Sequence, residues 1–434
     1  MDRIRVYTRS LGCPKNLVDT EKILGGLGEI YEAVEDISFS QVVIINTCSF
    51  IKPAVEESLD VIFSAHEEIK DLDKKPLLVV TGCLVSRYGA GLGAQIPEAD
   101  IYCSISEQSR LPYLIFQKLG LNQHEALTVG RKISTPRSYA YLKISEGCNN
   151  RCSFCTIPSI RGKLKSRTID EITAEASLLT DSGIRELVLV AQDSTAYGRD
   201  LGEKNGLAAL VKELSSVDSL KWLRILYLYP SGLKRNLLES IARIDGPFIP
   251  YFDVPFQHSH PDILRNMGRP FKDNPEKIIT IIKDVFPDAV IRSSLIAGYP
   301  GETEGHFDHL LSFVKKNKLD HLGVFPFYPE EGTRALGFVD QVSDEVKKHR
   351  VNEIMRVQKK VSRDKLKTFE NELIEVLVDG PHPEWPGLFT GRTWFQAPEI
   401  DGITYISGPD VKPGKMIRAR VEEARDYDLV ALQQ

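Results

Sequence analysis

Short apolar runs alternate with longer helix-like segments over most of this chain of 434 residues. Continuous Val, Ile and Leu runs are typical of parallel strands that are covered on both faces. This alternation restricts the chain to α/β folds, in which helices pack against parallel sheets. Together with the length, the pattern predicts a multidomain α/β protein with domains over residues 1–125, 136–370 and 371–434.

The N-terminal part predicts a doubly wound parallel α/β domain, because buried strands and helices alternate in it. The predicted strands and helices are Ile4–Thr8, Asn16–Leu27, Val42–Asn46, Pro53–Ile69 and Leu77–Thr81. A cysteine follows each of the three strands, namely Cys13, Cys48 and Cys83. Ligands of open α/β sheets bind at the carboxyl ends of the strands, so we expect the three thiols to meet there.

We interpret these three thiols as ligands of an iron–sulfur cluster that keeps one iron open. The alternative is three separate buried thiols, since free cysteine is often simply buried. Cys103 also follows a short strand-like segment, and we interpret it as a small buried hydrophobic residue.

The central part predicts six β/α units, which form a partial, six-stranded relative of the eightfold barrel. The predicted strands are Tyr139–Ile144, Glu186–Val190, Leu223–Leu228, Tyr251–Val254, Ala289–Ile296 and His321–Phe325. The predicted helices are Ile169–Ser182, Gly206–Ser215, Asn236–Ala242, Asn274–Val285, Thr303–Lys316 and Glu345–Phe369. Chemistry in such barrels takes place at the C-terminal ends of the strands.

Cys148, Cys152 and Cys155 follow the first of these strands in a C-x3-C-x2-C spacing. Thiolates this close on a short loop can turn toward one metal centre. A structural zinc site needs four ligands, and no histidine lies between Tyr139 and Asp170 to supply the fourth. Three thiolates on a four-iron cluster leave one iron open for a small molecule. The alternative is three buried, inert cysteines.

This spacing resembles the signature of the radical S-adenosylmethionine (SAM) superfamily. The resemblance implies a 4Fe-4S cluster whose open iron chelates SAM and whose reduced form cleaves it to a 5′-deoxyadenosyl radical. It also implies that Gln192 and Asp193, after the second strand, and Gly298 and Pro300, after the fifth, bind SAM. Asp193 has an alternative as a helix N-cap.

Three further side chains near these strand ends are candidates for the site. His258 is either a proton carrier or, as we favour, a hydrogen-bonded structural residue. Arg161 and Arg167 follow the cysteine loop, and each either pairs with a carboxylate of cofactor or substrate or is a solvated charge. The segment Phe325–Thr333 departs from the usual family pattern at Phe327-Tyr-Pro, so no role is carried over to it.

The N-terminal cysteine segments resemble the methylthiotransferase branch of the superfamily. The matching segments are Ser10-Leu-Gly-Cys-Pro-Lys-Asn-Leu-Val-Asp19, Asn46-Thr-Cys-Ser-Phe-Ile51 and Thr81-Gly-Cys-Leu84. The first is similar to the type that modifies a ribosomal protein, whereas the tRNA-modifying type reads Met-Gly-Cys-Gln-Met-Asn. The resemblance implies two 4Fe-4S clusters, SAM, an external electron donor and methylthiolation of an aspartate β-carbon in small-subunit ribosomal protein twelve.

The last 64 residues predict a small antiparallel β-barrel, which resembles the TRAM module. Its predicted strands are Leu373–Val378, Gly387–Arg392, Thr404–Ser407 and Met416–Val421. TRAM modules often bind RNA, but six Lys or Arg here face eleven Asp or Glu. An acidic surface repels phosphate and attracts a basic protein, which makes tRNA an unlikely partner. A merely solvated surface is the alternative.

Composition excludes several classes of protein. The net charge is −5, so a chain-wide basic footprint for nucleic acid is absent. The sequence has no uncharged apolar run of 18 residues, and its start lacks the plan of a signal peptide, so we expect a cytoplasmic protein without a membrane span. A tRNA methylthiotransferase and a non-enzymatic iron–sulfur scaffold remain as alternative functions.

Overall fold

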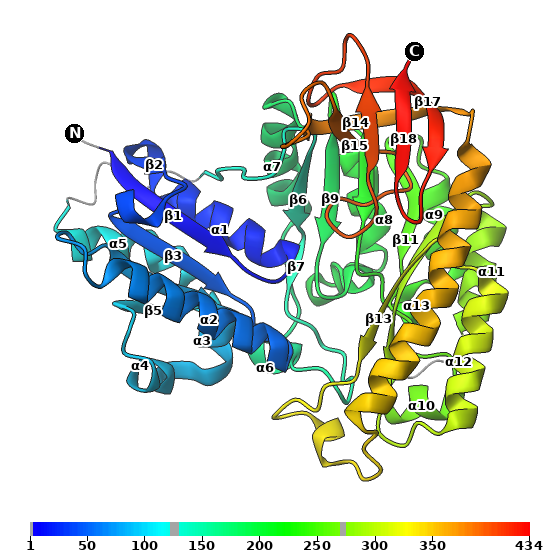
Figure 1. The fold of residues 1–434 in the computed structure, drawn as a ribbon, viewed down its shortest axis with the longest axis horizontal. Coiled ribbons are helices and arrows are strands. Elements are labelled where there is room, and N and C mark those ends of the chain that lie inside the picture. The colour runs from blue at the N-terminus through cyan, green and yellow to red at the C-terminus, as the bar shows by residue number, and fades with distance from the viewer. Residues whose placement is uncertain (1–2, 122–129, 270–274) are drawn as a thin grey trace.

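The computed structural model describes residues 3–121, 130–269 and 275–434. The predicted domain limits at residues 1 and 125 and the predicted helix start at Asn274 lie outside the described residues. Figure 1 shows three sheets that follow one another along the chain, in blue, in green to yellow, and in red. The central sheet lies between the other two, and the predicted α/β architecture is confirmed.

Five parallel strands form the N-terminal sheet in the order β2-β1-β3-β4-β5. These strands are β1 (Ile4–Ser10), β2 (Tyr31–Ala33), β3 (Val42–Thr47), β4 (Leu77–Gly82) and β5 (Ile101–Ser104). Its helices are α1 (Pro14–Gly26), α2 (Lys52–Ile69), α3 (Cys83–Tyr88), α4 (Leu92–Gln95) and α5 (Leu111–Leu119). One apolar core packs α1 and α5 on one face, and a second packs α2 and α3 on the other. This two-sided cover explains the continuous apolar runs and confirms the doubly wound domain.

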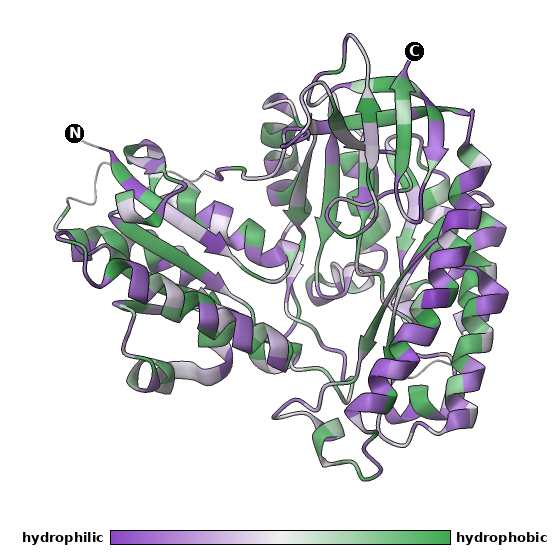
Figure 2. Ribbon diagram, in the orientation of Figure 1, coloured by the Kyte–Doolittle hydropathy of each residue, from purple (hydrophilic) through white to green (hydrophobic). Residues whose placement is uncertain are grey.

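Six parallel strands form the central sheet in the order β13-β12-β11-β10-β9-β6, as predicted. The strands are β6 (Tyr139–Lys143), β9 (Glu186–Val190), β10 (Trp222–Ile225), β11 (Phe248–Asp253), β12 (Val290–Ala297) and β13 (His321–Pro326). The covering helices are α7 (Ile169–Asp181), α8 (Gly206–Leu214), α9 (Arg235–Ala242), α11 (Pro275–Val285), α12 (Glu304–Asn317) and α13 (Asp344–Leu366). The strands are largely hydrophobic, whereas α13 is mostly hydrophilic (Figure 2).

Side chains alternate between the two faces of the central strands. Along β6, Ala140 and Leu142 join the core under the helices, whereas Tyr139 and Tyr141 point to the concave inner face. The segment 393–402 of the C-terminal barrel covers that inner face near the start of the strands, where Tyr139 donates to Glu399 at 2.9 Å. The opposite, C-terminal ends of the strands therefore remain for the cysteine loop and the N-terminal domain.

Five strands close the C-terminal barrel in the order β14-β15-β16-β18-β17. They are β14 (Leu373–Pro381), β15 (Phe389–Arg392), β16 (Thr404–Ser407), β17 (Met416–Ala424) and β18 (Leu429–Gln433). The predicted barrel is confirmed, with β18 as an additional strand. One pair, β16 with β18, runs parallel, and the other pairs run antiparallel. Among the described residues, no helix is both long and apolar enough to cross a membrane.

Candidate active site

The barrel trio, defined as Cys148, Cys152 and Cys155, lies on the loop between β7 (Ser145–Glu146) and the short helix α6 (Ile157–Arg161). All three cysteines are free and partly exposed. The Cys148 amide donates to the Gly162 carbonyl at 3.0 Å, and the Cys155 amide donates to the Cys152 carbonyl at 3.2 Å. The loop is thus fixed by backbone bonds and leaves its thiols accessible.

Asp193 joins the end of β9 to this loop. Its Oδ2 accepts a hydrogen bond from Asn150 Nδ2 at 2.8 Å, and its Oδ1 accepts one from Thr195 Oγ1 at 2.6 Å. Asp193 stands at the N-cap position of the 3-10 turn Ser194–Ala196, but its carboxylate makes no capping hydrogen bond to that turn. Gln192 donates to Glu146 at 3.1 Å, and its side-chain oxygen has no partner among the described residues.

The segment after β12 lies beside the cysteine loop, because the buried Tyr299 hydroxyl is 2.6 Å from Ser153 Oγ. Gly298 has a φ of +74°, and a Cβ there would lie 2.2 Å from Lys347 Cγ. Its amide donates to both carboxylate oxygens of Glu302 at 3.0 Å. Gly298 is therefore required by local packing, and its N–H is not free for a ligand. Pro300 is buried next to Tyr299.

His258 is fully buried near the same carboxylate. Its Nδ1 accepts the His260 amide at 2.9 Å, and its Nε2 lies 3.4 Å from Glu302 Oε2 without a hydrogen bond of good geometry. Burial lowers the pKa of His258, although Glu302 acts in the opposite direction. A neutral, internally bonded imidazole fits the structural role better than that of a proton carrier.

The N-terminal trio, defined as Cys13, Cys48 and Cys83, lies at the carboxyl ends of β1, β3 and β4. Gly12 has a φ of +85°, and a Cβ there would lie 2.8 Å from Cys48 Sγ, so the first two loops touch. Asn16 ties these loops together, because its Nδ2 donates to the carbonyls of Leu11 at 2.8 Å and Thr47 at 2.9 Å. The thiols that lie 35 residues apart in sequence are neighbours at one sheet edge, whereas Cys103 is buried on β5.

Burial and nearby charge act in opposite directions on these thiols. Burial raises the pKa of Cys48 to about 12, with the neighbouring Cys83 and Cys13 adding to the effect. Burial also acts to raise the pKa of Cys13, but the Lys15 and Arg161 cations outweigh it and lower that pKa. In the barrel trio, burial and Cys152 raise the pKa of Cys155 to about 12. Cys13 is therefore the thiol that its surroundings favour as a thiolate.

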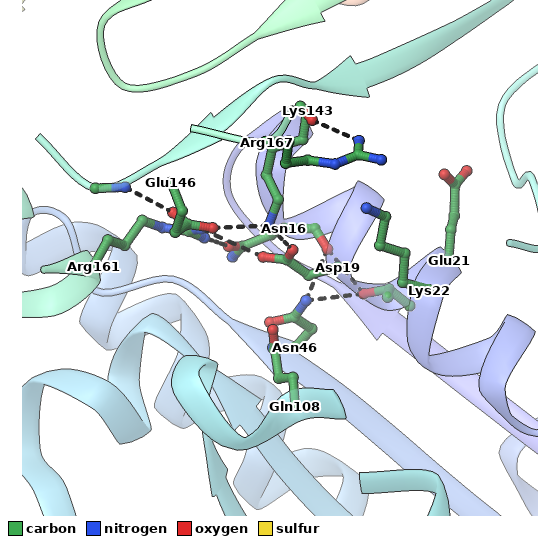
Figure 3. Close-up of polar contacts among 12 residues, drawn as sticks. Asn16, Asp19, Glu21, Lys22, Asn46, Gln108, Lys143, Glu146, Arg161 and Arg167 are labelled. Atoms are coloured by element: carbon green, nitrogen blue, oxygen red, sulfur yellow. Dashed lines mark hydrogen bonds and ion pairs between the residues drawn. The ribbon is translucent and has the colours of Figure 1, made fainter. Parts of the chain in front are cut away.

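A polar network joins α1 of the N-terminal domain to β6 and β7 of the central barrel (Figure 3). Arg161, which follows the barrel trio, is bonded to Glu146 at 2.8 Å and to Asp19 at 3.4 Å, and it donates to Cys83 Sγ at 3.5 Å. Lys143 pairs with the same two carboxylates. Burial opposes ionisation of Glu146, but Lys143 and Arg161 lower its pKa to about 2.

Both arginine candidates therefore pair with carboxylates of the protein itself. Arg167 is bonded to Glu175 at 2.7 Å and to the Lys143 carbonyl at 2.9 Å. Arg161 is buried, and it contacts Glu146, which directly precedes the loop of the barrel trio, and a thiol of the N-terminal trio. A single side chain thus connects the two sets of cysteines across the domain junction.

The cysteine geometry fits iron–sulfur clusters better than single ions. A mononuclear site with metal–sulfur bonds of about 2.3 Å needs its sulfur atoms within roughly 4 Å of one another. Among the described residues, neither trio has all three sulfur atoms within 4.8 Å of one another. The group that meets this criterion is His260, Asp262 and His306, but the Nδ1 atoms of both histidines accept backbone amides as helix caps. Three thiols at this separation suit a larger cluster better than a single ion.

Sequence reasoning missed the residues that surround the trios. Lys15, Asn16 and Asp19 belong to the motif that carried the family resemblance, but their partners are on the central barrel and are far away in sequence. Tyr227 was also missed, although it stands at the end of β10 with a φ of +59°. The strand-end position of Tyr227 is the signal that would have found it.

Family models match all three parts of the chain. Residues 5–104 match the uncharacterized protein family UPF0004, residues 142–314 match the radical SAM superfamily, and residues 372–432 match the TRAM domain. The ribosomal protein uS12 methylthiotransferase RimO of Nitratidesulfovibrio vulgaris strain DP4 is 52% identical, over 99% of this chain and 100% of the relative. The chain belongs to the RimO family.

Other comparisons agree with this membership. The ribosomal protein uS12 methylthiotransferase RimO of Oleidesulfovibrio alaskensis is 51% identical, again over 99% of this chain and 100% of the relative. The solved structure of the radical SAM methyltransferase TsrM from Kitasatospora setae aligns with a TM-score of 0.57 at 14% identity. That alignment covers 90% of this chain and 81% of the TsrM chain, and it supports the fold alone. The predicted family is confirmed, and with it a radical SAM enzyme that uses SAM and a 4Fe-4S cluster.

Proposed function

We propose that this chain attaches a methylthio group to the β-carbon of an aspartate in ribosomal protein uS12. Similarity to RimO relatives over almost the whole chain is the observation that carries the proposal. The two trios support it, because sulfur insertion at an unactivated C–H bond requires both hydrogen abstraction and a sulfur carrier. An acid–base pair cannot start this reaction, since the β-carbon offers no acidic proton.

In this proposal each trio holds one 4Fe-4S cluster. The clusters supply reductive cleavage of SAM at the barrel trio and a sulfur-carrying open iron at the N-terminal trio. The two trios belong to the two domains that meet at this junction, where Lys143 and Arg161 lower the pKa of Glu146 and also pair with Asp19. An external electron donor reduces the clusters.

Gln192, Asp193, Gly298 and Pro300 are the proposed SAM-binding residues. The Asp193 carboxylate is buried at 2% exposure beside the cysteine loop, and a carboxylate suits an ammonium group. Gln192 has an oxygen without a partner among the described residues, which supports a hydrogen bond to a ligand. Gly298 and Pro300 offer backbone and ring surface, since the Gly298 amide already bonds Glu302.

We assign residues 1–125 to the sulfur-carrying domain, 136–370 to the radical SAM barrel and 371–434 to substrate docking. Exposed acidic side chains on the C-terminal barrel would attract a basic ribosomal protein, although five exposed basic side chains nearly balance them, namely Lys412, Lys415, Arg418, Arg420 and Arg425. The exposed acidic residues are Glu372, Glu375, Glu384, Asp410, Glu422 and Glu423. A ribosomal substrate implies a cytoplasmic enzyme.

The test uses the protein with both clusters reconstituted, supplied with SAM, sulfide and a strong reductant. Mass spectrometry of purified uS12 should show a methylthio adduct on one aspartate, while transfer RNA in a parallel reaction stays unmodified. Modified tRNA with unmodified uS12 would replace the proposal by the tRNA alternative. No cleavage of SAM with either substrate would leave the iron–sulfur scaffold as the function.

A further inference from the structure

Lys15 is a buried cation that crosses the junction between the two trios. It lies in the first turn of α1, two residues after Cys13, and is 6% exposed. Its Nζ lies 3.4 Å from the Ala191 carbonyl at the end of β9. The same Nζ lies 3.3 Å from the centroid of the Tyr227 ring, at the end of β10. The ammonium therefore stands where the N-terminal trio faces the C-terminal ends of the barrel strands.

The hydrogen-bonding capacity of Lys15 is largely unused. An ammonium group has three donors, and among the described residues Lys15 makes one long bond to a carbonyl and no ion pair. Its neighbours Lys143 and Arg161, by contrast, each pair with both Asp19 and Glu146. A buried charge without a carboxylate partner is costly, so a site of this kind suits an incoming anion.

Tyr227 forms a rigid wall beside the ammonium. Its left-handed backbone is uncommon for a residue other than glycine. Two backbone bonds hold it, because its amide donates to Asp253 Oδ2 at 3.0 Å and its carbonyl accepts the Ser194 amide at 2.9 Å. Constrained backbone at strand ends is typical of ligand-binding positions. The ring and the Ala191 carbonyl are the contacts that the ammonium makes among the described residues.

We propose that Lys15 binds the carboxylate of the target aspartate and so places its β-carbon between the two trios. This inference rests on the proposed function, since the substrate anion is the aspartate of uS12. The β-carbon is directly bonded to the carboxylate carbon, so a cation at the carboxylate fixes the reacting atom as well. The adjoining residues Gln192 and Asp193 extend from Ala191 toward the cysteine loop, which places the barrel trio on the other side.

A double-mutant cycle tests this contact in the enzyme with both clusters loaded and SAM present. Binding of uS12 and of uS12 with its target aspartate changed to asparagine is measured without reductant, so that no turnover occurs. Wild type should bind the aspartate form on the order of tenfold more tightly than the asparagine form. A ratio of this size lies within the usual range of interaction free energies between two groups in contact. In Lys15→Met this ratio should fall to about one, and Lys15→Arg should retain part of it.

Lys22→Met is the matched control, because it removes a cation of the same helix that already has a carboxylate partner, Glu175 at 3.6 Å. Its aspartate-to-asparagine affinity ratio should equal that of wild type. Only variants with wild-type iron content and circular dichroism are compared. If Lys15→Met does not bind its clusters, Lys15→Gln replaces it in the binding measurement.

Three outcomes overturn the inference in different ways. If the ratio is unchanged in Lys15→Met or Lys15→Gln, Lys15 acts only on the charge of Cys13. If wild type modifies uS12 but binds both forms equally, the inference fails while the proposed function stands. If wild type neither binds nor modifies uS12, the proposed function fails and the inference fails with it.

Discussion

The central barrel meets its two neighbouring domains through junctions of opposite character. The junction with the C-terminal barrel is a continuous apolar core that joins strand residues such as Tyr141 and Tyr251 to Phe395 and Val421. Within it, the fully buried Glu186 pairs with both Arg224 and Arg392. Apolar burial of this kind stabilises a fixed arrangement of domains.

The junction with the N-terminal domain is mostly polar. Besides the network around Arg161, Arg87 pairs with Glu330 at 3.0 Å, and Arg131 pairs with Glu175 at 2.9 Å. Val18 is the one fully buried apolar residue that the N-terminal domain adds to the shared core, among the described residues. The polar side chains of this junction can pair with charged cofactors and a substrate carboxylate, whereas the buried charges of the other junction already pair with one another. The junction with the C-terminal barrel therefore contributes mainly to stability, and the junction with the N-terminal domain contains the proposed reaction site.

The largest expected effect separates the two trios. Cys13→Ala should lose about half of the bound iron and all methylthiolation, yet still form 5′-deoxyadenosine, because the barrel trio remains intact. Cys148→Ala should lose both reactions. Iron analysis and product chromatography measure these effects. Full iron content in Cys13→Ala would break the assignment of a cluster to the N-terminal junction.

Next in size is a change at the apolar junction. Arg392→Met leaves Glu186 short of a partner in a fully buried position, and the free energy of unfolding should fall by about 3–5 kcal/mol. Denaturant titration measures the loss, while iron loading at moderate temperature should stay normal because both trios lie elsewhere. Arg235→Met, which removes a half-exposed pair with Asp284, is the control and should leave stability almost unchanged.

A smaller effect concerns acid stability of the polar junction. The pKa of Glu146 is about 2 in the folded protein. Ionised Glu146 therefore stabilises the fold fully at pH values above the ordinary carboxyl pKa, and this stabilisation is lost as the pH falls toward 2. We expect wild type to lose up to about 3 kcal/mol more than Glu146→Gln between pH 5 and pH 2. Unfolding of the cluster-free proteins across this range measures the difference. If the free energy of unfolding changes with pH equally in wild type and Glu146→Gln, then Glu146 does not contribute to the acid stability of the junction.

The smallest effect tests whether the C-terminal barrel also takes part in function. Changing the exposed Asp410 and Glu422 to Asn and Gln should weaken uS12 binding about two- to fivefold at low salt. The effect should vanish at high salt, since surface charges are screened. Titration of uS12 at two ionic strengths measures it, with the exposed Glu345→Gln on α13 as control. If wild type, the Asp410 and Glu422 variant and Glu345→Gln bind uS12 equally at low salt, then these two acidic side chains do not take part in substrate binding.

Much of the fold could be predicted because its signals are local. Continuous apolar runs predicted the central strands of both sheets, and the alternating pattern predicted the C-terminal barrel. The short edge strand β2 was missed, since three residues carry too weak a pattern, and β5 was predicted only as a strand-like segment before Cys103, which in fact lies within it. The parallel pairing of β16 with β18 was also missed, because strand direction in a barrel depends on its closure.

The candidate site divides in the same way. The six cysteines were found from their spacing and from the rule that ligands gather at strand ends, whereas the partners of Lys15, Asp19 and Arg161 were not. The motif predicted that Gly298 lets the backbone approach a ligand. In the structure its amide donates to Glu302, and its lack of a Cβ leaves room for the Lys347 side chain.

By itself, the sequence determined the three-part α/β architecture and the positions of two cysteine trios, because periodicity and strand-end placement are properties of neighbouring residues. Only the tertiary structure decided that Arg161 reaches Cys83 and that Lys15 stands against Tyr227, with no carboxylate partner in the described part of the chain. Those contacts join residues more than 70 positions apart, and they depend on how two domains dock. The way two domains dock depends on the fit of shape and charge over their whole contacting surfaces. A pattern of neighbouring residues in the sequence contains no information about that fit.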